Sequence, residues 1–241
     1  MTDQQKDVWD RLWSGGVSYA WDPLSDALLK SIQTVAENVK GKKLLEAGSG
    51  TGKISLHLAR LGADVTLVDY SENALVNSRG AFLQAGCEAN FHLADIRQIP
   101  VPDNEYDLTW NAGVLEHFTF EEKVSILKEM ARITKPEGTV LVYTPYAKCL
   151  PYQIGKAYAE KQGTWMYGVE EPVLSLKKEF KKSKITLVKE THLGFLNSLD
   201  FLDFLPGSGA MKQWMHNWYE GLSAEEQSHF PGYLLVSVGR L

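Results

Sequence analysis

The stretch Leu44-Leu45-Glu46-Ala47-Gly48-Ser49-Gly50-Thr51-Gly52-Lys53 decides the fold of this 241-residue chain. Its first residues belong to a short apolar run, 43–47, which predicts a buried strand. The three glycines at alternate positions predict a turn, because glycine adopts positive φ and lets the backbone approach a ligand closely. Apolar residues then recur with roughly helical spacing over 53–61. A strand, a glycine-rich turn and a helix in this order predict the start of an α/β fold.

The same alternation of strand and helix patterns continues outward from this stretch. β-branched and apolar runs predict further strands at 63–69, 87–93, 106–111, 139–144, 185–193 and 233–238. Helical patterns lie at 72–85, with Ser71 as the N-cap, at 120–133 and at 171–182. Right-handed crossovers between such strands make a parallel sheet with helices on both faces. We therefore predict a seven-stranded, Rossmann-like α/β sheet.

The composition argues against several classes of protein. At 44% hydrophobic and 23% charged residues the chain is typical of a globular protein. No apolar run approaches the ~18 residues of a membrane span, and the first residues lack the apolar core of a signal peptide. A net charge of −5 disfavours nucleic-acid binding, since phosphate affinity comes chiefly from clustered Lys and Arg. Cys87 and Cys149 lack metal-ligand spacing. We expect a cytoplasmic, metal-free protein with a small-molecule ligand, as a monomer or homodimer.

Three kinds of ligand compete for the glycine-rich turn, because open α/β sheets bind ligands at the carboxyl ends of their strands. A dinucleotide fingerprint, G-x-G-x-x-G, needs glycine at position 53, where this chain has Lys53. A phosphate-binding P-loop needs Ser or Thr after its lysine, to bind magnesium, and this chain has Ile54 there. The third pattern, E-x-G-x-G-x-G, is present in full as Glu46, Gly48, Gly50 and Gly52.

This third pattern resembles the glycine-rich motif of the class I S-adenosylmethionine-dependent methyltransferases. Asp69, 17 residues past Gly52, matches the acidic residue that binds both ribose hydroxyls in that family; a carboxylate can accept both hydrogen bonds. Asp95 matches the acidic position that receives the adenine amino group. The segment 107–117 resembles the family's fourth-strand region, in which small-molecule members often carry Leu-Glu-His, and 135–139 resembles the turn before the fifth strand. A looser similarity to the ubiquinone-biosynthesis-type group carries no substrate with it.

The resemblance implies a fold, a cofactor and an activity. In the fold, the last strand runs antiparallel and lies between the fifth and sixth strands. The cofactor is S-adenosyl-L-methionine, and the activity is transfer of its methyl group to a small-molecule acceptor by in-line displacement. A protein methyltransferase of the same fold and a non-catalytic cofactor-binding or scaffold protein are the alternatives. The cofactor-binding residues that we carry over are Glu46, Gly48, Ser49, Gly50, Gly52, Asp69, Tyr70, Asp95, Ile96, Asn111 and Ala112.

Two aromatic or titratable features have a functional and a structural interpretation. His117 is a candidate general base, since imidazole titrates near neutrality, but packing beside the cofactor pocket is the favoured alternative. Trp9 and Trp13 have helical spacing and predict an N-terminal helix packed on the edge of the sheet. Alternatively, this segment closes over the cofactor with Tyr19 facing the sulfonium, because aromatic faces attract cations.

No repeat, low-complexity tract or Pro/Gly-rich linker divides the chain, so we expect a single methyltransferase domain over 1–241. Within it we expect an N-terminal helical cap at 1–40 and a cofactor-binding core at 41–145. Two insertions, a loop-like 146–170 and a segment 195–229, would form the lid over the acceptor. Their aromatic residues would mostly form a small core or an oligomer contact, with one or two lining the acceptor pocket.

Overall fold

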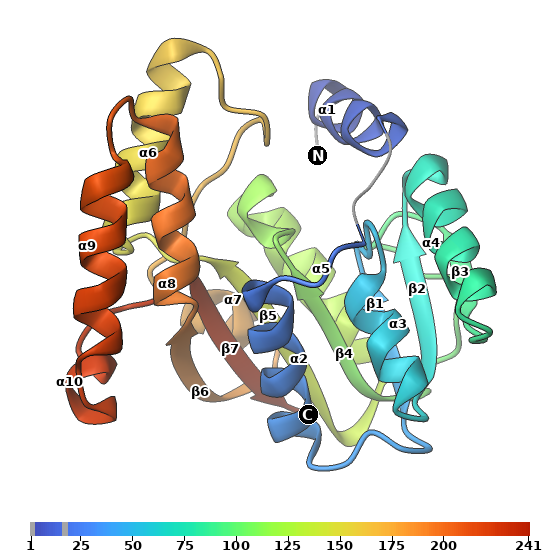
Figure 1. Cartoon of the computed structure of the whole chain (residues 1–241). Helices are drawn as coiled ribbons and strands as arrows, with labels where there is room; N and C mark the ends of the chain where they lie inside the picture. Colours follow the sequence, from blue (N-terminus) through green and yellow to red (C-terminus); the bar gives the residue numbers. More distant parts are fainter. Residues whose placement is uncertain (1–2, 16–18) are drawn as a thin grey trace.

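The computed structural model describes residues 3–15 and 19–241 of the chain (Figure 1). Its sheet has seven strands in the order β3-β2-β1-β4-β5-β7-β6. Neighbouring strands from β3 to β5 pair in parallel, and β7 is antiparallel to both β5 and β6. The predicted α/β sheet and the predicted place of its last strand are confirmed. The strands are β1 (Lys43–Ala47), β2 (Asp64–Asp69), β3 (Asn90–Leu93), β4 (Tyr106–Ala112), β5 (Thr134–Pro145), β6 (Thr186–Leu193) and β7 (Leu234–Arg240).

Helices cover both faces of the sheet because its central strands alternate apolar side chains between the two sides. Leu44 of β1 packs with α2 (Pro23–Ala36), α3 (Lys53–Arg60) and α4 (Glu72–Gln84). The next residue, Leu45, packs on the opposite face with α5 (Phe120–Ile133) and α7 (Lys177–Lys182). The remaining helices are α1 (Asp3–Ser14), α6 (Leu150–Gln162), α8 (Phe195–Ser198), α9 (Gly209–Glu220) and α10 (Ala224–Ser228), with 3-10 turns η1 (Leu115–His117) and η2 (Leu199–Phe204).

The first insertion differs from its prediction. The range 146–170 was expected to be loop-like, and that expectation is wrong, because 150–162 forms the helix α6. Its buried face includes Tyr152, Gly155 and Ala159, which are too small or too polar to give an apolar period. A Cβ on Gly155 would lie 2.1 Å from the carbonyl oxygen of Phe201, so glycine allows α6 to pack directly on η2.

Two further elements, one strand and one helix, begin later in the chain than the sequence indicates. The strand expected at 87–93 begins at Asn90, because the backbone N–H of Cys87 donates to the carbonyl of Phe82 and completes the end of α4. The helix expected at 171–182 begins at Lys177, beyond Pro172. Its N-terminal side is held by Glu190 of β6, whose carboxylate accepts from the N–H of Leu176 at 2.8 Å.

The second insertion forms a helical layer beside β7, where α8, η2 and α9 stack next to α6 (Figure 1). Phe195, Leu199 and Leu202 form its small buried core. Trp214 stacks on Trp218 with ring centroids 6.1 Å apart. Trp214 is 64% exposed and lies on the surface of the layer, whereas Trp218 packs against its core. Among the helices of the described ranges, none has the length and apolar character needed to cross a bilayer.

Candidate functional site

A cavity of about 660 Å³ opens at the carboxyl ends of β1, β2 and β4. Its volume lies within the range of pockets that hold small molecules, about 300–1,000 Å³. The glycine-rich turn forms one wall, the loop after β4 a second, and α1 a third. Most of the sequence-predicted site residues line it, namely Glu46, Gly48, Ser49, Gly50, Asp69, Tyr70, Asp95, Ile96, Ala112 and His117.

The glycine-rich turn requires its glycines for two reasons. All three have positive φ, at 79°, 49° and 64° for Gly48, Gly50 and Gly52, a region that disfavours other residues. A Cβ on Gly52 would lie 2.4 Å from Cδ2 of Leu67, so this glycine lets α3 pack against β2. Gly52 is not one of the residues that line the cavity. Its part in the site is therefore to set the path of the turn.

Asp69 lies at the end of β2 with its carboxylate against the turn. Oδ2 accepts from the N–H of Gly50 at 2.8 Å, and Oδ1 accepts from the N–H of Ser71 at 2.9 Å. The side chain is almost fully buried, and burial raises its pKa. A carboxylate has about four acceptor positions, so Asp69 can still accept hydrogen bonds from a ligand. Tyr70 follows it along the cavity wall.

Asp95 follows β3 and has a different environment from Asp69. Both of its oxygens accept from the guanidinium of Arg97, at 2.7 to 3.1 Å, and this contact lowers the pKa of Asp95. Arg97 also donates to Glu122 at 3.0 Å. The adjacent Ile96 lines the cavity and packs into the core beneath it. Asp95 therefore faces the cavity as one half of an ion pair.

Glu46 is buried at the end of β1 and touches the cavity. Its Oε2 accepts from the hydroxyl of Ser55 on α3 at 2.5 Å. Burial raises the pKa of Glu46 to about 8, and the carboxylate of Asp69 adds to the shift. The side chain is thus mainly protonated at neutral pH, and it connects the strand before the glycine-rich turn to the helix after it.

Asn111 and Tyr19 lie outside the cavity lining. The side-chain amide of Asn111 is fully buried and donates to the sulfur of Met130 on α5, at 3.4 Å. The hydroxyl of Tyr19 is buried near Ser78, and burial raises its pKa. Neither residue is among those that line the cavity, so their contacts with a cofactor stay predictions. Gly113 and Val114, which follow Ala112, do line it and were not singled out from the sequence.

Helix α1 lies over the cavity and is fixed to α4. The hydroxyl of Ser71 donates to Asp10 at 2.7 Å, and the amide of Asn77 donates to the carbonyl of Trp13 at 2.9 Å. Trp9, Asp10 and Trp13 line the cavity. A Cβ on Gly50 would lie 2.8 Å from the ring of Trp13, so the indole packs directly on the turn. Helix α1 therefore packs against α4 and also lies over the cavity, and the contact of Tyr19 with the sulfonium stays a prediction.

Lys53 lines the cavity beside the turn, and its ammonium is held by the segment before α2. Its ammonium pairs with Asp22, and the carbonyl of Ala20 is 3.4 Å away. Asp22 also caps α2 by accepting from the N–H of Ser25 at 2.8 Å. The side chain that breaks the dinucleotide fingerprint therefore joins the start of α3 to the start of α2.

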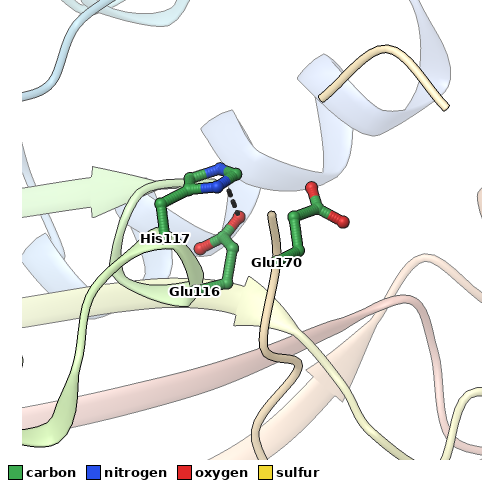
Figure 2. Close-up of side chains that lie close together, drawn as sticks. All are labelled: Glu116, His117 and Glu170. Carbon is green, nitrogen blue, oxygen red and sulfur yellow. Dashed lines mark ion pairs between the residues drawn. The ribbon is translucent and has the colours of Figure 1, made fainter. Parts of the chain in front are cut away.

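At its other end the cavity holds a cluster of Glu116, His117 and Glu170 (Figure 2). Glu116 and His117 are neighbours in η1, and Glu170 comes from the segment between α6 and α7. One ligand atom from each residue lies within 4.8 Å of the others. Glu170 was not singled out from the sequence, where its only signal is an acidic residue in an aromatic insertion.

Burial controls the protonation of all three side chains in this cluster. The side chain of His117 is 3% exposed, and burial lowers its pKa to about 4. Burial raises the pKa of Glu170 to about 7 and that of Glu116 well above its usual value, with repulsion from Glu170 adding to the second shift. Two further contacts orient the groups: Nδ1 of His117 lies 2.8 Å from the carbonyl of Val169, and the hydroxyl of Tyr152 donates to Glu170 at 2.8 Å.

Comparison with known proteins gives the family. Residues 44–138 match the family described as "Methyltransferase domain". A malonyl-[acyl-carrier protein] O-methyltransferase of Buchnera aphidicola is 34% identical over 136 residues, 53% of this chain and 52% of the relative. A ubiquinone/menaquinone biosynthesis C-methyltransferase of Paraburkholderia xenovorans is 30% identical over 182 residues, 68% of this chain and 70% of the relative. The first of these matches spans about half the length of the relative.

Solved structures with this fold support the assignment of the sheet. The magnesium protoporphyrin IX methyltransferase of Synechocystis, determined with bound SAH, superposes with a TM-score of 0.61 at 15% identity. The superposition covers 99% of this chain and 94% of that one, so the fold is shared over nearly the whole length. The 182-residue match and the matching domain family show that the chain belongs to the class I S-adenosylmethionine-dependent methyltransferase family.

Proposed function

We propose that this chain binds S-adenosyl-L-methionine and transfers its methyl group to a small-molecule acceptor by in-line displacement. The observation that carries the proposal is one continuous cavity with two chemically different ends. The glycine-rich turn and Asp69 form one end, and the Glu116, His117 and Glu170 cluster forms the other. A cofactor and an acceptor held in such a cavity would lie next to each other.

The residues at the first end suit the cofactor. Ser49 lines the cavity, and its buried hydroxyl has no hydrogen-bond partner within the described chain. A buried polar atom is costly to leave without a partner, so the hydroxyl is available to a ligand. Asp69 retains acceptor capacity for ribose hydroxyls, and Asp95 with Ile96 offers an edge for adenine. When bound, the cofactor supplies an electrophilic methyl carbon on a sulfonium.

The chain's own contribution is alignment and exclusion of water. Holding two reactants in attack geometry contributes about 7–11 kcal/mol in favourable cases. Trp13 over the turn and Trp9 beside His117 form an apolar cover that keeps water from the methyl carbon. His117, with a pKa of about 4, is a weak base, so we assign it a positioning role in place of general-base catalysis.

Isothermal titration with S-adenosylmethionine and with its demethylated product tests the cofactor. The proposal predicts saturable binding of both, and no heat with either at millimolar ligand would contradict it. A screen of metabolite extracts with a labelled methyl group then tests the acceptor. Because the similar proteins are named as an O-methyltransferase and a C-methyltransferase, the first compounds to test are carboxylic acids and quinone precursors.

Two alternatives have distinct outcomes in the same screen. A non-catalytic cofactor-binding or scaffold protein would bind the cofactor but label no compound in any pool. A protein methyltransferase would label polypeptides and leave the small molecules unlabelled.

Three other expectations stay predictions. Cell fractionation tests the cytoplasmic location, filter binding tests the lack of nucleic-acid binding, and analytical ultracentrifugation tests the monomeric or homodimeric state.

A further inference from the structure

The cluster of Glu116, His117 and Glu170 has the donor set of a metal site. It offers two carboxylates and one imidazole, with one ligand atom from each within 4.8 Å of the others. Around a cation with bonds of about 2.1 Å, neighbouring ligands in an octahedron lie about 3 Å apart and opposite ones about 4.2 Å apart. Movements of about 1 Å in each side chain would therefore close the three donors on a shared ion.

Glu116 supplies an independent observation that points to a ligand. It is 2% exposed, and its Oε2 is buried without a hydrogen-bond partner in the described chain. The side chain points toward His117 and lies beside Glu170 (Figure 2). Two neighbouring carboxylates in a largely buried site favour a nearby cation. The ammonium of Lys123 acts on Glu116 and that of Lys156 acts on Glu170, but Lys156 also pairs with Glu160 and lies over the ring of Trp165.

Contacts outside the cluster hold its side chains as metal ligands are commonly held. A neutral His117 that donates from Nδ1 to the carbonyl of Val169 carries its lone pair on Nε2, and Nε2 lies 3.9 Å from Oε1 of Glu116. Tyr152 on α6 fixes Glu170 through its hydroxyl. Such hydrogen bonds to backbone or side-chain groups orient metal-binding histidines and carboxylates.

We propose that Glu116, His117 and Glu170 form a binding site for a divalent cation such as Mn²⁺, Fe²⁺ or Zn²⁺. The imidazole favours these ions over Ca²⁺, which takes six to eight oxygen ligands. All three residues line the cavity, so a cation bound to them would be within reach of a molecule held in that cavity. Resting on the proposed function, we further assign the acceptor to the class of molecules with an oxygen that can bind this cation.

A bound cation would supply what the side chains at this end do not. It lowers the pKa of an oxygen that coordinates it and stabilises the anion. We therefore expect recognition of an acceptor hydroxyl, enol or carboxyl group to depend on the metal ion. Binding of the cofactor should not depend on it.

The test is titration of chelator-treated protein with Mn²⁺, followed by loss of the electron paramagnetic resonance signal of the free ion, without cofactor. We expect one equivalent of Mn²⁺ per chain. Glu116→Gln and Glu170→Gln should each weaken binding by at least about 10-fold. Glu171→Gln makes the same charge change at the exposed neighbouring residue and should bind as the wild type does.

If neither Mn²⁺ nor Zn²⁺ binds saturably, or if all variants bind equally well, the proposed site is wrong. The carboxyl groups would then share a proton or hold a cationic part of the acceptor. Near-UV circular dichroism checks that each variant is folded, and Glu170→Asp, which keeps the charge but shortens the side chain, provides a second variant with weakened binding. Calorimetry with S-adenosylmethionine on the chelated protein tests the proposed function separately, because either result can fail without the other.

Discussion

The indole of Trp9 meets the imidazole of His117 edge-on, with ring centroids 5.1 Å apart and planes at 81°. Trp9 also stacks on Trp13, at 5.8 Å and 16°, and Trp13 packs over Gly50. A continuous aromatic path thus runs along α1 from the polar cluster to the glycine-rich turn. The position of α1 therefore affects both ends of the cavity at once.

The first prediction concerns this cover. Trp13→Ala removes the ring over Gly50 and exposes the turn to water, which should weaken binding of S-adenosylmethionine by about 10-fold or more, as expected for loss of a largely buried aromatic contact of about 1.5–3 kcal/mol. Isothermal titration measures the change. Trp214→Ala is the control, since Trp214 lies on the exposed face of α9; equal losses in the two variants would place the effect outside the cavity.

The two aspartates at the strand ends should differ in their effect on the cofactor. Asp69→Ala removes a buried carboxylate that has no ion pair within residues 3–15 and 19–241 and should weaken S-adenosylmethionine binding by about 100-fold, the value of two charged hydrogen bonds. Asp95→Ala removes a carboxylate already paired with Arg97 and should weaken it far less. Dissociation constants of the two folded variants decide between them. Equal, negligible effects would show that both assignments are wrong.

Glycine can be required in a turn because φ is positive or because there is no space for a Cβ. Substitutions of Gly52 and Gly86 distinguish these two causes. Both have φ near 63°, but a Cβ on Gly52 would overlap Leu67, whereas a Cβ on Gly86 would meet nothing within 4 Å. Gly86→Ala should therefore lower the free energy of unfolding by about 1 kcal/mol, the cost of the left-handed conformation alone. Gly52→Ala should lower the free energy of unfolding by about 1–3 kcal/mol more than Gly86→Ala does, because the core must shift. Urea unfolding measures both, and similar values for the two variants would contradict the packing argument.

Glu46 should make stability depend on pH. Its pKa is about 8 in the folded chain and near 4.5 in the unfolded chain, so between these values the folded state binds more protons. Stability conferred by the protonated group is therefore lost as pH rises from about 5 to 8, by up to about 1.4 kcal/mol per pH unit. Glu46→Gln keeps an acceptor for Ser55 and should remove this contribution. Parallel stability profiles for wild type and variant across this range would refute the assignment.

The sheet and the glycine-rich turn could be predicted from the sequence because each rests on a local physical requirement. Buried parallel strands need apolar runs such as 64–69, and the positive φ values at Gly48, Gly50 and Gly52 leave glycine as the favoured residue. Helix α6 could not, because its buried face includes Gly155 and Ala159, which carry almost no hydrophobic signal.

Glu170 could not be predicted for a different reason. Its significance comes from Tyr152, Glu116 and His117, which are distant in the sequence and approach it only in the folded chain. Asp69, in contrast, follows a strand at a spacing that the turn itself defines. The turn and the strand end that line the cavity could thus be predicted from local elements, whereas Glu170, which depends on contact between separate segments, could not. The roles of all these residues stay predictions.

The pairing of β6 with β7 has a consequence for how the chain reaches its native state. β6 lies at the sheet's edge beside β7, and every residue of α8, η2, α9 and α10 falls between these two strands in the sequence. During synthesis on the ribosome, β6 can join the sheet only after Leu234–Arg240 has emerged, because β7 lies between β6 and β5. Until then the partly made chain presents an uncovered β5, which makes this interval the stage at which a chaperone would be most useful.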